Sequence, residues 1–158
     1  MSSLRSLLIG TAAGAVGTAA LNVTTYADMA TRGRPASEAP GTMVQKVASA
    51  NGVTALASDD DTAKNRREGV SSLLGYANGL GVGAAYGVLR PIFRGRIPYV
   101  LTGLLAGAAV MALSDVPLTR TGATDPKKWG TAGWLADIVP HMMFGLALAA
   151  SFEALAKE

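Results

Sequence analysis

Glycine recurs at every fourth position in the middle of the chain, inside the uncharged run 69–89, at Gly75, Gly79, Gly83 and Gly87. A helix rises about 1.5 Å per residue and bilayer hydrocarbon is about 30 Å thick, so roughly 20 apolar residues cross it. Glycine disfavours a helix in water, but in lipid the backbone must bond internally, and small residues let helices approach closely. We therefore interpret 69–89 as a membrane-spanning helix with the glycine row as its packing face.

Three further segments, at about 4–27, 97–114 and 131–155, are apolar enough to cross a bilayer. Hydrophobic residues make up 49% of the chain and charged residues only 16%, where soluble domains have roughly 25% charged. The first segment could be a signal peptide, but its uncharged stretch 6–27 exceeds the usual signal core of roughly 7 to 15 residues, so we expect it to be retained. The sequence predicts one all-α membrane domain over 1–158, with four transmembrane helices packed through Gly/Ala faces.

Other predicted spans also carry small residues four apart. Gly10 and Gly14 form such a pair in the first span, and Gly103 and Gly107 form one in the third. Pairs of this kind mark faces where two helix backbones meet. We expect the face of 97–114 to be the partner of the glycine row.

The polar loop 28–68 separates the first two spans. Its prolines and glycines break a continuous helix, and Thr42–Ala50 is predicted as a short amphipathic helix on the membrane surface or against the bundle. The acidic run 59–61 could suggest a metal, but neighbouring carboxylates point in different directions and no further ligands follow. An acidic helix start with Asp61 as N-cap explains the run better. A second short helix is predicted after Asp125, which precedes a proline.

Asp137 and His141 are the titratable residues that we expect to lie inside the membrane. They are one helical turn apart, and Pro140 between them frees a backbone carbonyl. Intramembrane ionisable groups are costly and often functional, so a proton relay or ion site is one hypothesis. The other is structural: the two side chains bond each other, or Asn22, Tyr76 or Asn78 across the bundle.

Several classes of chemistry have no support in the sequence. The absence of cysteine excludes disulfides, thiolate metal sites and thiol catalysis. The single histidine could supply only one axial haem ligand per chain, so haem ligation has little support. No nucleophile has a base at motif spacing, so covalent catalysis has none. The sequence has no basic face with interleaved aromatic residues, the pattern that would suggest nucleic-acid binding. We expect no catalytic residues, no metal and no cofactor.

The basic residues give conflicting signals about orientation. Arg5, Arg90, Arg94, Arg96 and Lys157 are five of the 14 basic residues, and four spans place them on the side of the termini. The raw count favours the termini outside. The crowding of three arginines in a short turn next to the membrane favours the termini inside, which we expect.

The pattern resembles the YagU-like group of uncharacterised bacterial inner-membrane proteins. The matching stretches are the proline-containing segment 33–40 after the first span, a basic turn leading into 103–108, and an acid shortly before a histidine in the last span, here Asp137 and His141. The resemblance implies four membrane helices, the bacterial cytoplasmic membrane and cytoplasmic termini. It implies no reaction.

The leading hypothesis for function is an accessory or scaffold subunit without enzymatic activity, which self-associates or packs onto other membrane proteins. Its basis is that the glycine rows offer more close-packing surface than one small bundle needs. The alternative is a small channel or proton-coupled transporter, in which Asp137 and His141 titrate and Asn22 and Asn78 line the path.

Overall fold

The computed structural model describes residues 2–94 and 96–157, and its regular elements are all helices in those ranges. Four helices are long: α1 (Ser3–Arg32), α4 (Asp61–Phe93), α5 (Tyr99–Arg120) and α6 (Gly130–Leu155). Three are short: α2 (Ala39–Ala50), α3 (Thr54–Ala57) and the 3-10 helix η1 (Pro126–Lys128). The prediction of an all-α fold is confirmed.

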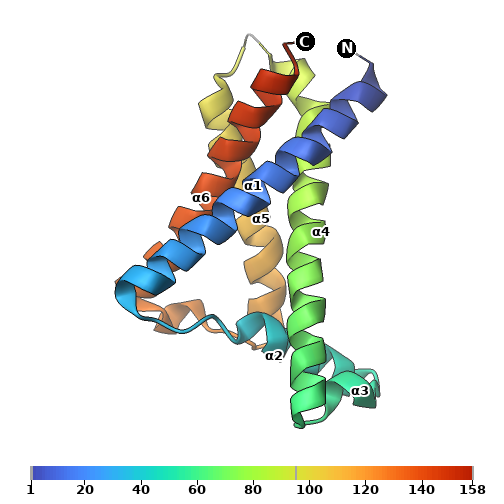
Figure 1. Ribbon diagram of the computed structural model, residues 1–158, viewed down its shortest axis with the longest axis vertical. Helices are drawn as coiled ribbons and strands as arrows, with labels where there is room; N and C mark the ends of the chain where they lie inside the picture. The colour runs from blue at the N-terminus through green and yellow to red at the C-terminus, as the bar shows by residue number, and fades with distance from the viewer. Residues whose placement is uncertain (1, 95, 158) are drawn as a thin grey trace.

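The long helices alternate in direction between the two ends of an elongated bundle (Figure 1). α1 runs from the end that carries both chain termini to the opposite end, where α2 and α3 lie. α4 returns along its side, α5 runs back, and α6 brings the chain to its starting end. We refer to these as the terminal end and the loop end.

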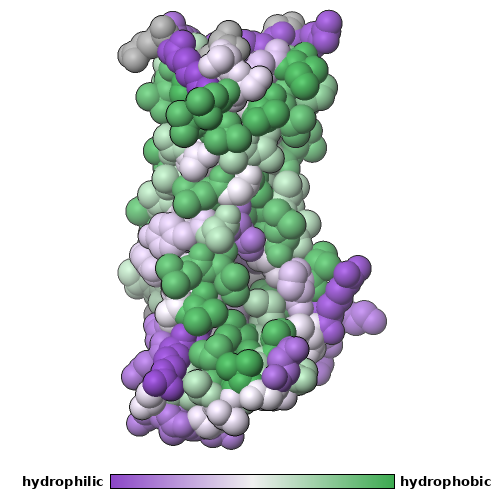
Figure 2. Space-filling model, turned by 90° about the vertical axis from the view of Figure 1, so that its right-hand side faces the viewer, coloured by the Kyte–Doolittle hydropathy of each residue, from purple (hydrophilic) through white to green (hydrophobic). Residues whose placement is uncertain are grey.

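Three helices, α1, α5 and α6, are long and apolar enough to cross a membrane. A band of apolar side chains lies between hydrophilic residues at the two ends in the face shown in Figure 2. The prediction of membrane-spanning helices is therefore supported for these three. α4 is outside the group because its glycines, serines, Tyr76 and Asn78 lower its hydropathy, and its first turns are charged.

The glycine row of α4 packs against α1. A Cβ atom at Gly83 would lie 2.5 Å from the Gly10 carbonyl oxygen and 2.6 Å from the Cα of Gly14. Such distances are too short for real atoms, so the two backbones touch only because both lack side chains there. Gly79 and Gly87 are also buried, whereas a Cβ at Gly75 would meet no atom of another segment within 4 Å. The prediction that 97–114 packs on the glycine row was wrong.

The small residues of α5 instead meet α6. A Cβ at Gly103 would lie 2.7 Å from the carbonyl oxygen of Gly145, and one at Gly107 would lie 2.5 Å from that of His141. α6 therefore packs between α1 and α5, while α4 and α5 touch less. Sequence analysis did not single out Gly145, which lacks a glycine four residues away.

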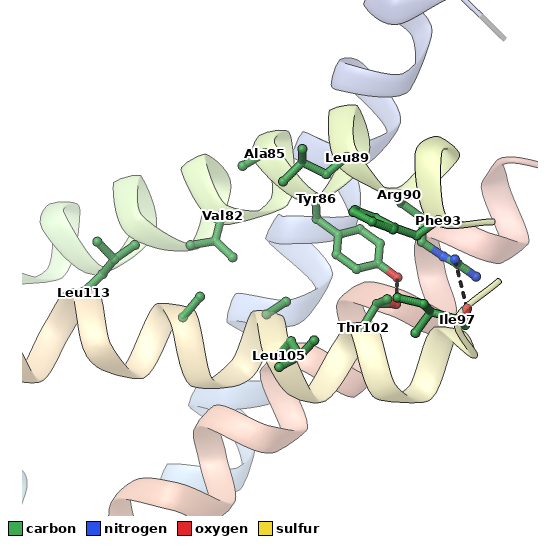
Figure 3. A pocket seen from close by; sticks show the side chains of 12 residues that line it. Val82, Ala85, Tyr86, Leu89, Arg90, Phe93, Ile97, Thr102, Leu105 and Leu113 are labelled. Carbon is green, nitrogen blue, oxygen red and sulfur yellow. Dashed lines mark hydrogen bonds between the residues drawn. The ribbon is translucent and has the colours of Figure 1, made fainter.

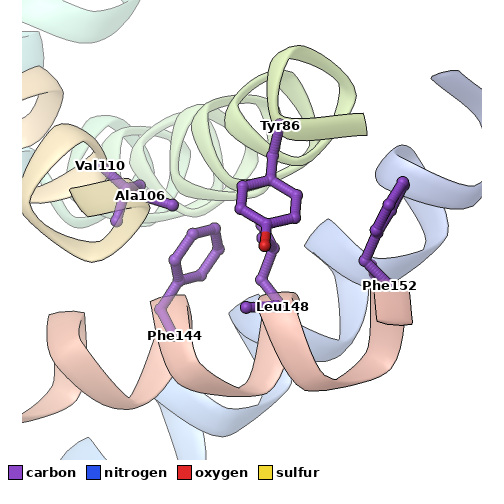
Figure 4. Close-up of a cluster of buried hydrophobic side chains, with 8 residues drawn as sticks. Tyr86, Ala106, Val110, Phe144, Leu148 and Phe152 are labelled. Atoms are coloured by element: carbon purple, nitrogen blue, oxygen red, sulfur yellow. The ribbon is translucent and has the colours of Figure 1, made fainter. Parts of the chain in front are cut away.

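The buried core is built on α6 (Figure 4). Phe144, Leu148 and Phe152 are its largest fully buried side chains. Tyr86 of α4 meets the Phe152 ring edge to face, with centroids 5.5 Å apart, and Ala106 and Val110 of α5 complete the cluster. Phe144 also lies against Gly17 of α1, where a Cβ would be 2.9 Å from the ring.

At the loop end, some of the predicted helix starts, ends and caps agree with the structure and others do not. Asp125 caps η1 as predicted, accepting a hydrogen bond from the backbone N–H of Lys127. The helix predicted at Thr42–Ala50 exists as α2 but begins at Ala39, because Pro40 is tolerated in a first turn. The N-cap of α4 is Asp60 rather than Asp61. α5 continues through Pro117 to Arg120, beyond the predicted end at 114.

Candidate functional site

The candidate site lies on α6, where Asp137 and His141 face each other. His141 Nδ1 is 2.7 Å from the backbone carbonyl oxygen of Asp137 and 3.3 Å from its Oδ1. The carbonyl only accepts, so Nδ1 is the atom that donates to it. The hypothesis that the two residues contact each other agrees with this geometry, which their spacing of four residues produces.

A third ionisable side chain joins the pair from α5. The carboxyl group of Asp115 lies close enough to the Asp137 carboxyl and to His141 for their charges to interact. Asp115 is two residues before Pro117 and five before the end of α5 at Arg120, and only the continuation of α5 past its predicted end brings it here. The site is therefore an interhelical cluster of two carboxyls and one imidazole.

The cluster is largely enclosed and incompletely hydrogen-bonded. The His141 side chain is 11% exposed and that of Asp137 is 20% exposed. Among the buried side-chain polar atoms of residues 2–94 and 96–157, Oδ2 of Asp137 is the one without a hydrogen-bond partner. A buried carboxylate oxygen without a donor is unfavourable, so each native example needs a physical reason. A proton held between Asp115 and Asp137 would provide that donor.

The other polar residues named from the sequence are not part of the cluster. No hydrogen bond links Asn22, Tyr76 or Asn78 to Asp137 or His141 in the described part of the chain. Tyr76 is half exposed on α4, and Asn22 and Asn78 are partly buried on α1 and α4. The structural hypothesis therefore survives only in its intrahelical form.

Two features of the structure were not predicted from the sequence. Asp115 was assigned to a helix end, because Pro117 is a common stop signal. Arg90 and Glu153 form an ion pair at the terminal end, with 2.6 Å between Nε and Oε1, across 63 residues of sequence. A pair so distant in sequence leaves no local pattern. The crowding of three arginines in one turn, with an acid near the end of the chain, was the sequence signal that could have indicated an ion pair there.

The geometry gives limited chemical options. Among residues 2–94 and 96–157, no group of three or more His, Asp and Glu side chains is arranged to hold a metal ion. Comparisons with protein-family models, with curated proteins and with solved structures find no match. The function must therefore be argued from the cluster and the bundle alone, and the resemblance to the YagU-like group stays a prediction.

Proposed function

We propose that this chain is a four-span membrane protein that binds protons at Asp115, Asp137 and His141 and couples their binding to movement of α5 against α6. In this role it is a small carrier of protons rather than an enzyme. The observation that carries the proposal is the buried carboxylate oxygen of Asp137 next to a second carboxyl and an imidazole. We place the protein in a bacterial cytoplasmic membrane with the arginine-rich terminal end in the cytoplasm.

Chain continuity supports α4 as the fourth span. α1 ends at the loop end and α5 begins at the terminal end, so α4 connects the two ends alongside α1 (Figure 1). If α1, α5 and α6 cross a bilayer in this arrangement, α4 crosses the same thickness. Its low hydropathy is acceptable because Gly79, Gly83, Gly87 and Arg90 lie against protein rather than lipid.

The charges of the cluster favour reversible proton binding. With two ionised carboxylates and a neutral imidazole the cluster has a charge of −2, and among residues 2–94 and 96–157 no arginine or lysine is paired with it. The first two bound protons reduce that charge to zero in a region of low dielectric constant, where uncompensated charge is costly. Because Asp115 is on α5 and the other two groups are on α6, proton uptake changes repulsion between the helices into attraction.

Core packing favours a carrier over an open channel. The cluster lies in the part of the bundle toward the loop end, in the first half of α6. Beyond it toward the terminal end, Phe144, Leu148 and Phe152 fill the interior with apolar side chains. A proton reaching His141 from the loop end therefore needs a rearrangement to continue.

The accessory role stays a prediction with less support. Its basis was spare glycine surface, but Gly79, Gly83 and Gly87 are occupied by α1, and Gly103 and Gly107 by α6. Gly75 is the member of the row that faces outward. The mass of the particle extracted gently from its membrane, with its associated chains identified, tests self-association and partners directly.

The proposed function is tested with purified protein reconstituted in vesicles that contain a pH-sensitive dye. An inward proton gradient should acidify these vesicles faster than protein-free ones, and Asp137→Asn and Asp115→Asn should each remove most of the difference. Asp125→Asn is the matched control, since Asp125 is a loop-end cap and Asn also caps helices. Acidification equal to that of empty vesicles, or unaltered in Asp137→Asn, would contradict the proposal.

The fourth span is tested separately, using the absence of cysteine. Single cysteines at Asn51 and Arg96, which are both exposed and flank α4, are offered an impermeant thiol reagent in sealed vesicles. Four spans predict labelling of the two positions from opposite sides. Labelling of both from one side would show that α4 does not cross.

A further inference from the structure

A hollow of about 410 Å³ lies between α4 and α5 at the terminal end (Figure 3). Its wall is almost entirely apolar, with Val82, Leu89 and Phe93 from α4 facing Leu105, Ala109 and Leu113 from α5. The volume is within the range of roughly 300 to 1,000 Å³ that is usual for small-ligand sites. This groove exists because α5 packs on α6 instead of on the glycine row.

The few polar groups of the groove are bonded to protein. The Tyr86 hydroxyl is 2.9 Å from the Thr102 hydroxyl, and Arg90 donates to Glu153 and to the Ile97 carbonyl oxygen. These bonds leave the groove without polar groups that would hold a hydrophilic ligand along its length. Its occupant is therefore apolar where it lies between the helices.

The mouth of the groove is positively charged. A second hollow of about 370 Å³ adjoins it and is lined by Arg90, Arg96, Ile97, Pro98 and Tyr99. Arg90 and Arg94 share the Glu153 carboxylate, whereas Arg96 pairs with no carboxylate in the described residues. Three guanidinium groups against one carboxylate leave a surplus of positive charge beside an apolar groove.

The dimensions indicate which apolar occupant fits. On α4 the groove extends from Val82 to Phe93, about 16 Å of helix and about half of the roughly 30 Å of bilayer hydrocarbon. Dividing 410 Å³ by that length gives a mean cross-section of about 25 Å², whereas a helix about 10 Å wide needs roughly 80 Å². An extended hydrocarbon chain fits inside the groove, whereas a partner helix could only lie across its open side.

We propose that the groove binds one anionic phospholipid from the adjoining leaflet. An acyl chain lies between α4 and α5, and the phosphate is held at the terminal end by Arg96, which lines the adjoining hollow. Guanidinium groups suit phosphate because they donate several hydrogen bonds in a fixed plane. The inference uses the four-span arrangement proposed above, but it does not depend on the proton site.

The probe is phosphatidylglycerol, with phosphatidylcholine of the same acyl chains for comparison. The full chain is purified in a mild detergent, titrated with each lipid, and bound lipids are counted by native mass spectrometry. We expect one phosphatidylglycerol per chain to be retained in preference to phosphatidylcholine. Arg96→Gln should weaken its binding about fivefold, the size expected for one basic residue near an anionic lipid.

Each variant has a matched control. Arg120→Gln removes an exposed arginine at the loop end and should leave binding unchanged. Ala109→Phe fills the groove and should abolish retention, whereas Ala108→Phe adds the same ring at an exposed neighbour outside it. Circular dichroism verifies folding, and Ala109→Leu offers a milder filling if Ala109→Phe does not fold.

Three outcomes would overturn the inference. Equal retention of both lipids would show that no headgroup site exists, and unchanged binding in folded Ala109→Phe or Ala109→Leu would show that no acyl chain occupies the groove. The third uses a photoreactive amino acid in place of Leu89, which lines the groove on α4, in membranes; cross-linking to a second protein instead of to lipid would identify a protein occupant. A failed α4 crossing appears in cysteine labelling instead, so the two failures are distinguishable.

Discussion

Arg90 and Glu153 connect the ends of α4 and α6 through an ion pair with 2.6 Å between Nε and Oε1. The Arg90 side chain is 5% exposed and that of Glu153 is 16% exposed. Arg90 also donates to the carbonyl oxygen of Ile97, 3.2 Å away, in the turn before α5. One buried guanidinium thus links three segments at the terminal end, where Arg94 contributes a second, weaker contact to Glu153.

Removal of the acid should be much more costly than removal of the outer arginine. Glu153→Gln leaves the buried Arg90 charge uncompensated, and we expect about 3 kcal/mol less stability, near the lower end for broken buried pairs. Arg94→Gln, which loses a 3.3 Å contact from a side chain that is 42% exposed, should change stability by less than about 1 kcal/mol. Reversible unfolding in mixed micelles measures both, and equal losses would contradict a buried pair.

The row of glycines should not respond uniformly to alanine. Gly83→Ala forces apart α1 and α4, since its Cβ would be 2.5 Å from the Gly10 carbonyl oxygen, and it should cost about 1 to 3 kcal/mol. Gly75→Ala, in the same row but with nothing within 4 Å, should be neutral or stabilising. The same unfolding assay ranks them. A destabilised Gly75→Ala beside an unaffected Gly83→Ala would mean that another face packs.

The glycine pattern indicated a packing face but not its partner. Gly10, Gly14, Gly103 and Gly107 have the same spacing, and close packing requires only small residues on both sides, so either pair could have met the row. The structure pairs the row with α1 and leaves α5 to α6. This choice depends on the full set of helix contacts, which a motif of two residues does not encode.

The candidate site was half predictable for a similar reason. Asp137 and His141 meet because residues four apart share a helix face, which the sequence alone implies. Asp115 reaches them from another helix, and only because α5 tolerates Pro117 near its end. Proline costs a helix one hydrogen bond and some bending, a local penalty that tertiary packing can offset.

The start of α4 should lose stability in acid. Asp60 accepts hydrogen bonds from the Ser58 hydroxyl and, at 2.8 Å, from the backbone N–H of Ala63, and these lower the pKa of its carboxyl below the ordinary 3.8. A lowered folded-state pKa stabilises the fold above pH 3.8, and that contribution is lost as the pH falls below it. Hydrogen exchange at the Ala63 amide should therefore accelerate as the pH falls through this range, after correction for intrinsic rates.

The matched variant for this acid effect is Asp60→Asn. Asparagine caps a helix nearly as well as aspartate but does not titrate, so protection of the Ala63 amide should become independent of pH in this range. Asp61→Asn, one residue into the helix, should retain the wild-type pH dependence. If Asp60→Asn retains it too, another group causes the loss.

Arg67 should be needed to fix the α2–α3 region on the bundle. Its buried guanidinium donates through Nη1 to the carbonyl oxygens of Leu56 and Ser58, at 3.0 and 2.6 Å, where the chain between α3 and α4 turns. Arg67→Lys retains the charge, but the shorter and more flexible lysine side chain does not carry its ammonium as far as Nη1 of arginine. We expect faster proteolysis within 51–60 in Arg67→Lys. Arg66 is exposed, so Arg66→Lys should be cleaved at the wild-type rate. α4 carries Arg67 at the loop end and Arg90 at the terminal end, so loosening at one end could reach the other. If the packing of Tyr86 on Phe152 is unchanged in Arg67→Lys, the loop end loosens independently of the core.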